Sequence, residues 1–270
     1  MLPIMDYVVV TLNDKETIVN TIDSIIEQNN RGKIIVIISD RSSDGTRDLV
    51  DAMLRDGKID IIYPENLGLA FARELAIEVV DTEWFVFVDG DVELTSTWAE
   101  EMEKHFNYLQ AFNPGMICGY LYRNEEQAKY LYDTAKRKQV TDRVYTHNTI
   151  VSTRGAKDWY PPEGINAYED YLLTQYLLER GYTGWMVPVI AFHDHRGSAW
   201  SEATWGGSGA KKSGYYTNIF APFKYLIGSI YGGLKRTLKT RKSSFLKISI
   251  IKGCGTLWGY IRANKYSRKD

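Results

Sequence analysis

The chain has 270 residues, of which 44% are hydrophobic and 25% are charged, an ordinary composition for a folded globular protein. That length accommodates one large α/β domain with an appendage, or two small domains. There is no run of about 18 apolar residues and no basic, apolar leader, so neither a conventional membrane span nor a signal peptide is expected. The two cysteines, Cys118 and Cys254, have no metal-like spacing, which fits a reducing compartment or indifference to redox.

Basic residues are concentrated in the last quarter of the chain. Residues 205–270 contain 14 lysines and arginines and one acid, Asp270, whereas the first 204 residues contain 19 basic and 33 acidic residues. An uneven distribution of this size indicates two roles, with the basic part facing an anionic surface. No recognised nucleic-acid-binding module accompanies the charge, so nucleic acid is not the expected partner.

The first ninety residues alternate between short β-branched runs and amphipathic stretches. Buried strands are predicted at residues 7–12, 33–39, 59–63 and 84–88. Helices are predicted between them, around residues 18–26, 46–54 and 69–80. This alternation predicts an α/β fold with a Rossmann-like, mostly parallel sheet flanked by helices.

The pattern weakens from about residue 94. Further helices are predicted at residues 98–109, 125–138 and 168–182, the last closed by Gly181, and a strand at residues 185–192. Beyond residue 204 the composition becomes rich in glycine, lysine and aromatic residues. We therefore divide the chain into a catalytic domain, residues 1–204, and a basic amphipathic C-terminal region, residues 205–270.

Acidic residues follow the predicted strands at the point where each strand ends. Asp40 and Asp44 follow the second strand, and Asp89 and Asp91 follow the fourth. In parallel α/β sheets the chemistry gathers at the carboxyl ends of the strands. Two carboxylates flanking Gly90 are hard oxygen ligands suited to a divalent cation, which can neutralise the pyrophosphate of a sugar nucleotide.

Five segments occur in an order and spacing that resemble the inverting family 2 glycosyltransferases with the GT-A fold. The resemblance covers about residues 5–200 and implies a superfamily, but neither a donor nor an acceptor. The segments are V-T-L-N (10–13), S-D-R-S-S-D-G-T (39–46), E-N-L-G-L-A-F-A-R (65–73), F-V-D-G-D (87–91) and Y-E-D-Y-L-L (168–173).

The resemblance implies a role for each matching residue. Asp170 matches the catalytic base, with Glu169 as its neighbour in the site. Asp89 and Asp91 match the DxD motif, which meets the donor and the metal ion, with Asp91 as the metal ligand. A histidine after the next strand matches a further metal or diphosphate contact, and we favour His195 over His193 by a small margin. The remaining donor-binding positions are Thr11, Asp40, Asn66, Gly68 and Arg73.

Two departures from the family pattern bear on the nucleotide. The first acid of the family's D-D-G-S loop is Ser39 here, and its glycine is Arg41. The usual aromatic residue of the first motif is Leu12. The base of the donor therefore stays open.

The C-terminal region contains apolar and aromatic residues at helical spacing, with basic residues on other faces. Basic amphipathic helices of this kind lie in the plane of a membrane interface. The alternative is a helical appendage packed on the catalytic domain. The apolar residues are Phe220, Phe223, Ile227, Ile230, Tyr231, Leu234 and Leu238, and the basic residues are Lys224, Lys235, Lys239 and Arg241.

These features together predict a hexosyltransferase that moves a sugar from a nucleoside-diphosphate donor to a lipid-linked or glycan acceptor. The expected mechanism is an inverting displacement assisted by Mn²⁺ or Mg²⁺, with one carboxylate as base. The expected location is the cytoplasm, peripherally on an anionic membrane. The alternatives are a non-catalytic sugar-nucleotide or glycan-binding protein and a sugar nucleotidyltransferase, although residues 13–16 lack the glycine-rich basic loop that the latter needs. A dehydrogenase is disfavoured because no G-x-G-x-x-G follows a strand.

Overall fold

The computed structural model describes residues 2–28, 31–53, 59–65, 68–123, 139–165, 167–193 and 198–266. The chain forms two compact units. The first comprises Met1–Pro161 and Asp170–His195, and the second comprises Pro162–Glu169 and Arg196–Asp270. The domain boundary expected at residue 204 falls inside helix α8 (Ala199–Lys212) of the second unit.

The N-terminal part of the first unit is a parallel sheet with its connecting helices, as predicted. Strands β3, β2, β1 and β4 lie next to one another in that order, and all their pairings are parallel. The strands are β1 (Met5–Thr11), β2 (Arg31–Ile38), β3 (Ile59–Ile62) and β4 (Trp84–Asp89). The helices are α1 (Ile18–Ile26), α2 (Thr46–Met53) and α3 (Leu69–Val79).

The rest of the first unit extends the same sheet with mixed pairing, giving a nine-stranded sheet among the described residues. Strand β6 pairs with β9 in parallel, whereas β4–β8, β6–β8, β5–β9 and β7–β9 are antiparallel. The predicted helix at residues 125–138 lies outside the described residues. The elements are β5 (Val92–Leu94), α4 (Trp98–Leu109), η2 (Gln110–Phe112), β6 (Pro114–Tyr122), β7 (Gln139–Val140), β8 (Asn148–Ser152), α6 (Thr153–Ala156), α7 (Glu169–Glu179) and β9 (Thr183–His193).

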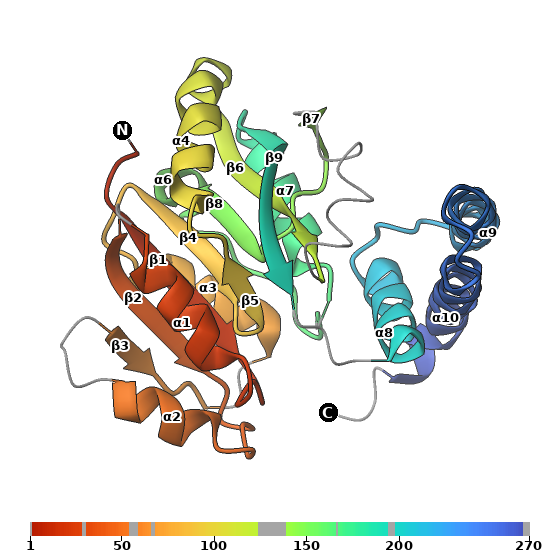
Figure 1. Cartoon of the computed structure of the whole chain (residues 1–270), viewed down its shortest axis with the longest axis horizontal. Helices are drawn as coiled ribbons and strands as arrows, with labels where there is room; N and C mark the ends of the chain where they lie inside the picture. Colours follow the sequence, from red (N-terminus) through yellow and green to blue (C-terminus); the bar gives the residue numbers. More distant parts are fainter. Residues whose placement is uncertain are drawn as a thin grey trace. The chain divides into compact units, whose positions relative to one another are not determined.

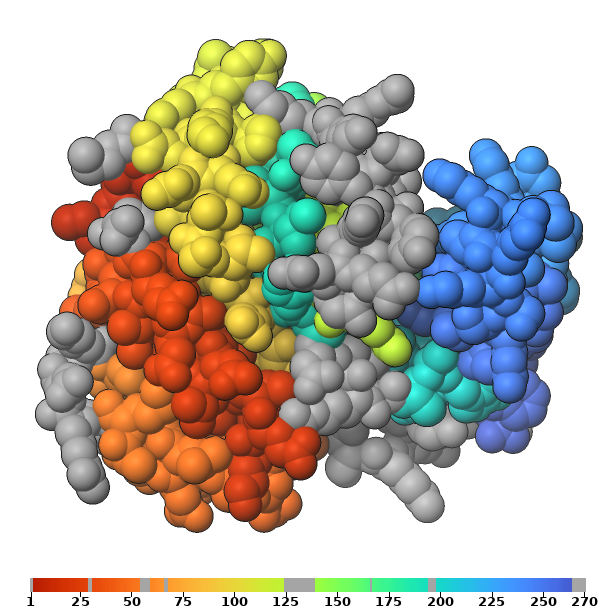
Figure 2. All heavy atoms as spheres, viewed as in Figure 1, coloured from red at the N-terminus to blue at the C-terminus, as the bar shows by residue number. Residues whose placement is uncertain are grey.

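Each face of the sheet has its own apolar core. On one face, Ile22 of α1 and Trp98 of α4 pack with strand residues such as Val9, and Figures 1 and 2 show these two helices on the same side of the unit. On the other face, Ala76 of α3 and Leu173 of α7 pack against the opposite sides of the strands. Because both faces are covered, the central strands are continuous apolar runs rather than alternating ones.

The described residues of the second unit form three helices, α8, α9 (Phe220–Thr240) and α10 (Ser244–Tyr266), with α10 packed against both others. Glycines allow α8 and α10 to approach closely. A Cβ on Gly207 would collide with the carbonyl oxygen of Thr256, and a Cβ on Gly259 would collide with that of Thr204. Within the described ranges, no helix has the length and apolar character needed to cross a membrane.

Candidate active site

The register of the parallel strands brings three of the predicted site residues to one edge of the sheet. Thr11 pairs with Ile38 at the end of β2, and Val10 pairs with Asp89 at the end of β4. Asp40 follows β2 by two residues and is half-buried. The carboxyl ends of β1, β2 and β4 therefore meet where the sequence placed the donor site.

Gly90 fixes the turn that presents the two acids of the DxD motif. Its amide donates to the carbonyl of Val10 at 3.1 Å, and its carbonyl accepts from the hydroxyls of Thr17 and Thr21, each at 3.1 Å. A Cβ at this position would lie 2.6 Å from Thr11 Oγ1, which is too close for any side chain. The DxD therefore needs glycine at its centre, and its backbone is held from both sides.

Asp89 is paired with Arg73 of α3. Arg73 Nη2 donates to Asp89 Oδ1 at 2.6 Å; the Arg73 side chain is 3% exposed, whereas that of Asp89 is 34% exposed. Burial acts to raise the pKa of Asp89, but the charge and hydrogen bond of Arg73 hold this pKa below its ordinary value. The guanidinium also lies over the ring of Phe87, 5.1 Å from its centroid. Arg73 thus keeps an anionic oxygen at the sheet edge.

Asp91 faces His193 across the antiparallel pair β5–β9. His193 Nε2 lies 2.8 Å from Asp91 Oδ2, and both side chains are 26% exposed. Pairing of Val92 with His193 places the two side chains together. His195, which the sequence favoured, lies outside the described residues, so the choice between the two histidines stays a prediction.

The Asp91–His193 pair fits a divalent cation. Adjacent ligands on an octahedral metal with bonds of about 2.1 Å lie about 3 Å apart, close to the separation of these two donor atoms. Among the described residues, no group of three or more His, Cys, Asp and Glu side chains forms a metal cluster by itself. Mg²⁺-type ions commonly take one or two protein ligands and complete their shell with substrate phosphates and water.

Asp14 is a third acid at this edge, and the sequence reasoning did not single it out. Its Oδ2 accepts from Thr11 Oγ1 at 2.7 Å and from the amide of Leu12 at 3.2 Å. Burial, with the nearby charge of Asp91, raises the pKa of Asp14 to about 6, although the Thr11 hydrogen bond opposes the shift. The sequence did contain a signal for this residue, because Asp14 is an acid that lies three residues after the end of β1.

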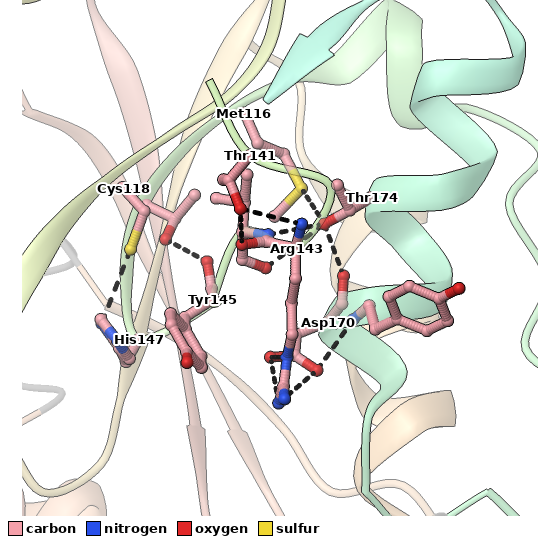
Figure 3. A network of polar contacts seen from close by, with 11 residues as sticks. Met116, Cys118, Thr141, Arg143, Tyr145, His147, Asp170 and Thr174 are labelled. Atoms are coloured by element: carbon pink, nitrogen blue, oxygen red, sulfur yellow. Dashed lines mark hydrogen bonds and ion pairs between the residues drawn. The ribbon is translucent and has the colours of Figure 1, made fainter. Parts of the chain in front are cut away.

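Asp170 lies in the first turn of α7 and is buried (Figure 3). Its Oδ2 accepts from Arg143 Nε at 3.1 Å and from Nη2 at 3.0 Å. Its Oδ1 accepts from the amide of Tyr171, the next residue of the helix, at 2.8 Å. Glu169 is also buried, with 5% exposed.

The segment from Arg143 to His147 links Asp170 with the DxD edge. The Arg143 guanidinium lies 4.9 Å from the Tyr145 ring centroid, and the Tyr145 ring stacks on His147 at 5.4 Å. The carbonyl of His147 accepts from the amide of Asp89 at 3.3 Å. Burial lowers the pKa of His147 to about 3, against the attraction of Asp89.

Sequence reasoning missed Arg143, Tyr145 and His147 because their segment has neither a helical nor a strand period. Gly68 is the residue before α3, with extended backbone angles. Asn66 lies outside the described residues. The donor-binding roles of Thr11, Asp40, Gly68, Arg73 and Glu169 stay predictions, as does that of Asn66.

A family model described as Glycosyl transferase family 2 matches residues 6–157, more than half of the chain. The chain belongs to glycosyl transferase family 2. The teichoic acid poly(glycerol phosphate) polymerase of Staphylococcus epidermidis is 35% identical over 92 residues, 33% of this chain and 13% of that protein. The putative teichuronic acid biosynthesis glycosyltransferase TuaG of Bacillus subtilis is 28% identical over 110 residues, 40% of this chain and 42% of that protein. The matched regions cover less than half of either relative.

Solved structures share the fold at low sequence identity. The mannosyltransferase PcManGT from Pyrobaculum calidifontis, in complex with GDP-Man and Mn²⁺, has a TM-score of 0.70 at 12% identity and covers 100% of this chain and 89% of its own. Residues 1–349 of S. aureus TarS, in complex with UDP-GlcNAc, have a TM-score of 0.55 at 14% identity, and the match covers 98% of this chain and 93% of that one. These similarities confirm the GT-A fold predicted from the sequence.

Proposed function

We propose that this protein transfers a sugar, with inversion, from a nucleoside-diphosphate donor to an acceptor hydroxyl or phosphate. The observation that carries the proposal is the convergence of the Arg73–Asp89 and Asp91–His193 pairs at the carboxyl edge of the parallel strands. Asp170 supplies a buried carboxylate at a helix start, linked to that edge through residues 143–147. One carboxylate is enough for an inverting transfer because a metal-bound diphosphate needs no protein acid to leave.

In this proposal each group has one task. Asp91 and His193 would hold a Mn²⁺ or Mg²⁺ ion, which would neutralise the charge of the donor pyrophosphate. Asp170 accepts the proton of the acceptor as the acceptor oxygen bonds to the anomeric carbon. The bond from that carbon to the diphosphate oxygen breaks, and the nucleoside diphosphate leaves from the opposite face. Arg73 keeps Asp89 ionised beside the pyrophosphate.

The donor class is supported by the fold neighbours, one of which holds GDP-Man with Mn²⁺ and another UDP-GlcNAc. The acceptor class is supported by relatives named for teichoic acid and teichuronic acid synthesis. A lipid-linked or glycan acceptor is compatible with the names of both relatives. The hexosyl specificity, and a cytoplasmic location, remain parts of the proposal.

A donor panel tests the proposal. We expect one of the UDP-, GDP- or dTDP-sugars to raise the melting temperature in Mn²⁺ and to do so less in EDTA, because a specific ligand stabilises the folded state by mass action. The same sugar nucleotide should be consumed when acceptor is added. Binding without turnover or hydrolysis would instead support a non-catalytic sugar-nucleotide-binding protein.

We also propose that helix α9 attaches the protein to an anionic membrane. The apolar stripe predicted from the sequence is exposed along this helix, and the basic residues complement an anionic lipid surface. Helix α9 packs on α10 with Gly233 against Ser249, and the residues of the stripe are exposed. The exposed residues are Phe220 (77%), Phe223 (45%), Ile227 (69%), Ile230 (39%), Tyr231 (70%), Leu234 (45%) and Leu238 (73%).

Flotation of the full-length protein with vesicles tests this attachment. The wild type should float with anionic vesicles, less with neutral ones, and less at high salt, since screening weakens the electrostatic share. Replacing Phe220, Ile227 and Leu238 by serine should abolish flotation. Gly228→Ser is the matched control, because a side chain at Gly228 meets open space on the same helix. Equal flotation of the triple variant and the wild type would refute the role of α9.

A further inference from the structure

Both oxygens of the Asp170 carboxylate accept hydrogen bonds, and Arg143 contacts both of them (Figure 3). Arg143 Nε and Nη2 occupy Oδ2 at 3.1 and 3.0 Å, and Nη2 also reaches Oδ1 at 3.3 Å. The amide of Tyr171 occupies the other position of Oδ1 at 2.8 Å. A carboxylate has about four lone-pair sites. Three hydrogen-donating groups, Arg143 Nε, Arg143 Nη2 and the Tyr171 amide, therefore occupy most of these sites, and an incoming hydroxyl has to compete with Arg143 for the carboxylate.

The backbone that carries Arg143 is fastened to the helix that carries Asp170. Thr174 of α7 bonds both the amide and the carbonyl of Val144, at 3.0 and 3.3 Å. Gln175 donates to the carbonyl of Asp142 at 2.7 Å, one residue before Arg143. Release of Asp170 therefore requires a rotation of the Arg143 side chain and leaves the loop in place.

The exposure of the two partners indicates which of them moves. The Arg143 side chain is 19% exposed, whereas that of Asp170 is 8% exposed. The Tyr145 ring beneath the guanidinium is part of a half-exposed residue, and this cation–π contact does not depend on the carboxylate. The guanidinium is thus the outer, more accessible member of the pair.

We propose that Arg143 keeps Asp170 occupied until an anionic acceptor arrives, and then binds the phosphate or carboxylate of that acceptor. This inference rests on the proposed function, because it assumes that Asp170 is the base. A guanidinium binds a phosphate with the same two-pronged geometry as a carboxylate, so the arginine exchanges one anion for another. Asp170 becomes able to accept a proton only when the correct acceptor is in place.

The exchange protects the donor from water. When Asp170 is released without an acceptor, a water molecule can attack the anomeric carbon and pass its proton to Asp170. The bond between that carbon and the diphosphate oxygen then breaks, giving free sugar and nucleoside diphosphate. Loss of Arg143 should therefore increase hydrolysis of the donor and impair transfer to an anionic acceptor.

The test measures release of nucleoside diphosphate without acceptor, using the sugar nucleotide that gives the largest thermal shift. We expect Arg143→Gln to raise this hydrolysis roughly 10- to 100-fold, the equivalent of one charge-assisted hydrogen bond of about 1.5–3 kcal/mol. The hydrolysis rate of Arg143→Lys should lie between those of Arg143→Gln and the wild type. The double variant Arg143→Gln, Asp170→Asn should not show the increase. Arg180→Gln is the matched control, because Arg180, like Arg143, lies over a tyrosine ring, in this case that of Tyr176 in α7.

A second measurement adds a small anionic compound to the wild type and to Arg143→Gln. Phenyl phosphate, added at saturating donor, should stimulate hydrolysis by drawing Arg143 away, and Arg143→Gln should not respond to it. Hydrolysis by Arg143→Gln that falls to the level of Asp170→Asn would overturn the inference, provided that the variant still unfolds cooperatively and is still stabilised by the donor. So would a wild type that phenyl phosphate leaves unchanged. Absence of any donor shift in the wild type would contradict the proposed function instead.

Discussion

The two arginine–carboxylate pairs of the candidate active site are buried in opposite ways. In Arg73–Asp89 the arginine is the buried member, at 3% against 34% exposed. In Arg143–Asp170 the carboxylate is the buried member, at 8% against 19%. In the first pair the buried Arg73 holds the more exposed carboxylate of Asp89 at the sheet edge. In the second pair the buried Asp170 holds the more exposed guanidinium of Arg143.

This difference teaches what each pair is suited to do. A carboxylate that a buried guanidinium keeps ionised suits a site for a metal ion and a pyrophosphate, because the charge of such a site has to stay the same throughout the reaction. A buried carboxylate covered by an accessible guanidinium suits a group that acts only at one stage of a reaction.

The largest effect is expected at Asp91. Asp91→Asn removes a hard ligand opposite His193, so transfer should fall by roughly 10⁴-fold or more, because a metal supplies several kcal/mol of charge stabilisation. Donor binding should also weaken, and the melting temperature without ligand should stay near that of the wild type. Steady-state transfer and thermal shift with Mn²⁺ measure both. Full activity of the wild type in EDTA would refute the metal assignment.

Asp170→Asn should lower turnover by roughly 10²–10⁴-fold, because the amide cannot accept the proton of the acceptor. Donor affinity should change little, which separates this variant from Asp91→Asn. Turnover near that of the wild type, under conditions where chemistry limits the rate, would make Asp170 a helix-start residue. Glu169 would then become the candidate base, with Glu169→Gln as the deciding variant.

The opposite burial of the pairs predicts opposite effects on stability. Asp89→Asn removes the counter-charge of the buried Arg73 and should cost about 3–5 kcal/mol, whereas Arg73→Met leaves a partly exposed carboxylate and should cost less than half of that. For the second pair the order reverses, with Arg143→Met costing more than Asp170→Asn. Urea unfolding at pH 7 measures all four. If the carboxylate variant were the more destabilising one in both pairs, or the arginine variant in both, stability would not depend on which partner is buried.

The smallest effect concerns His147, whose segment joins the two pairs. Its pKa is lowered to about 3 by burial, from an ordinary value of 6.5. Between these pH values the unfolded chain binds a proton that the folded one does not, so stability is complete above pH 6.5 and falls as the pH drops toward 3. The slope from this one group is at most about 1.4 kcal/mol per pH unit.

His147→Phe keeps the ring against Tyr145 and removes the titration. Urea unfolding of the metal-free protein between pH 4 and 7 should therefore show a shallower pH dependence than in the wild type. An unchanged slope would mean that His147 is not the group responsible.

Much of the fold was predictable from local patterns. Strands β1, β2 and β4 each contain a continuous apolar run, and α4 begins and ends at the residues that the sequence indicated. Once a parallel sheet is inferred, acids that follow its strands must meet at one edge. The position of Asp89 and Asp91 therefore followed from strand order and needed no tertiary information.

The mixed part of the sheet was not predictable in this way. Strands β6 and β8 were missed because their apolar runs carry no period that separates a strand from a buried helix, and β8 has only five residues. Their pairing with β4 and β9 is what brings residues 143–147 beside the DxD edge.

By itself the sequence determined the parallel strands, the acids at their ends, the apolar stripe of α9 and the family resemblance, because each depends on neighbours within a few residues. Only the tertiary structure decided the partners of those residues. Asp91 meets His193 and Asp170 meets Arg143 across 102 and 27 residues, and no local period records such distances. The tertiary structure also decided that the stripe of α9 is exposed within its own unit, because this depends on how α9 packs on α10.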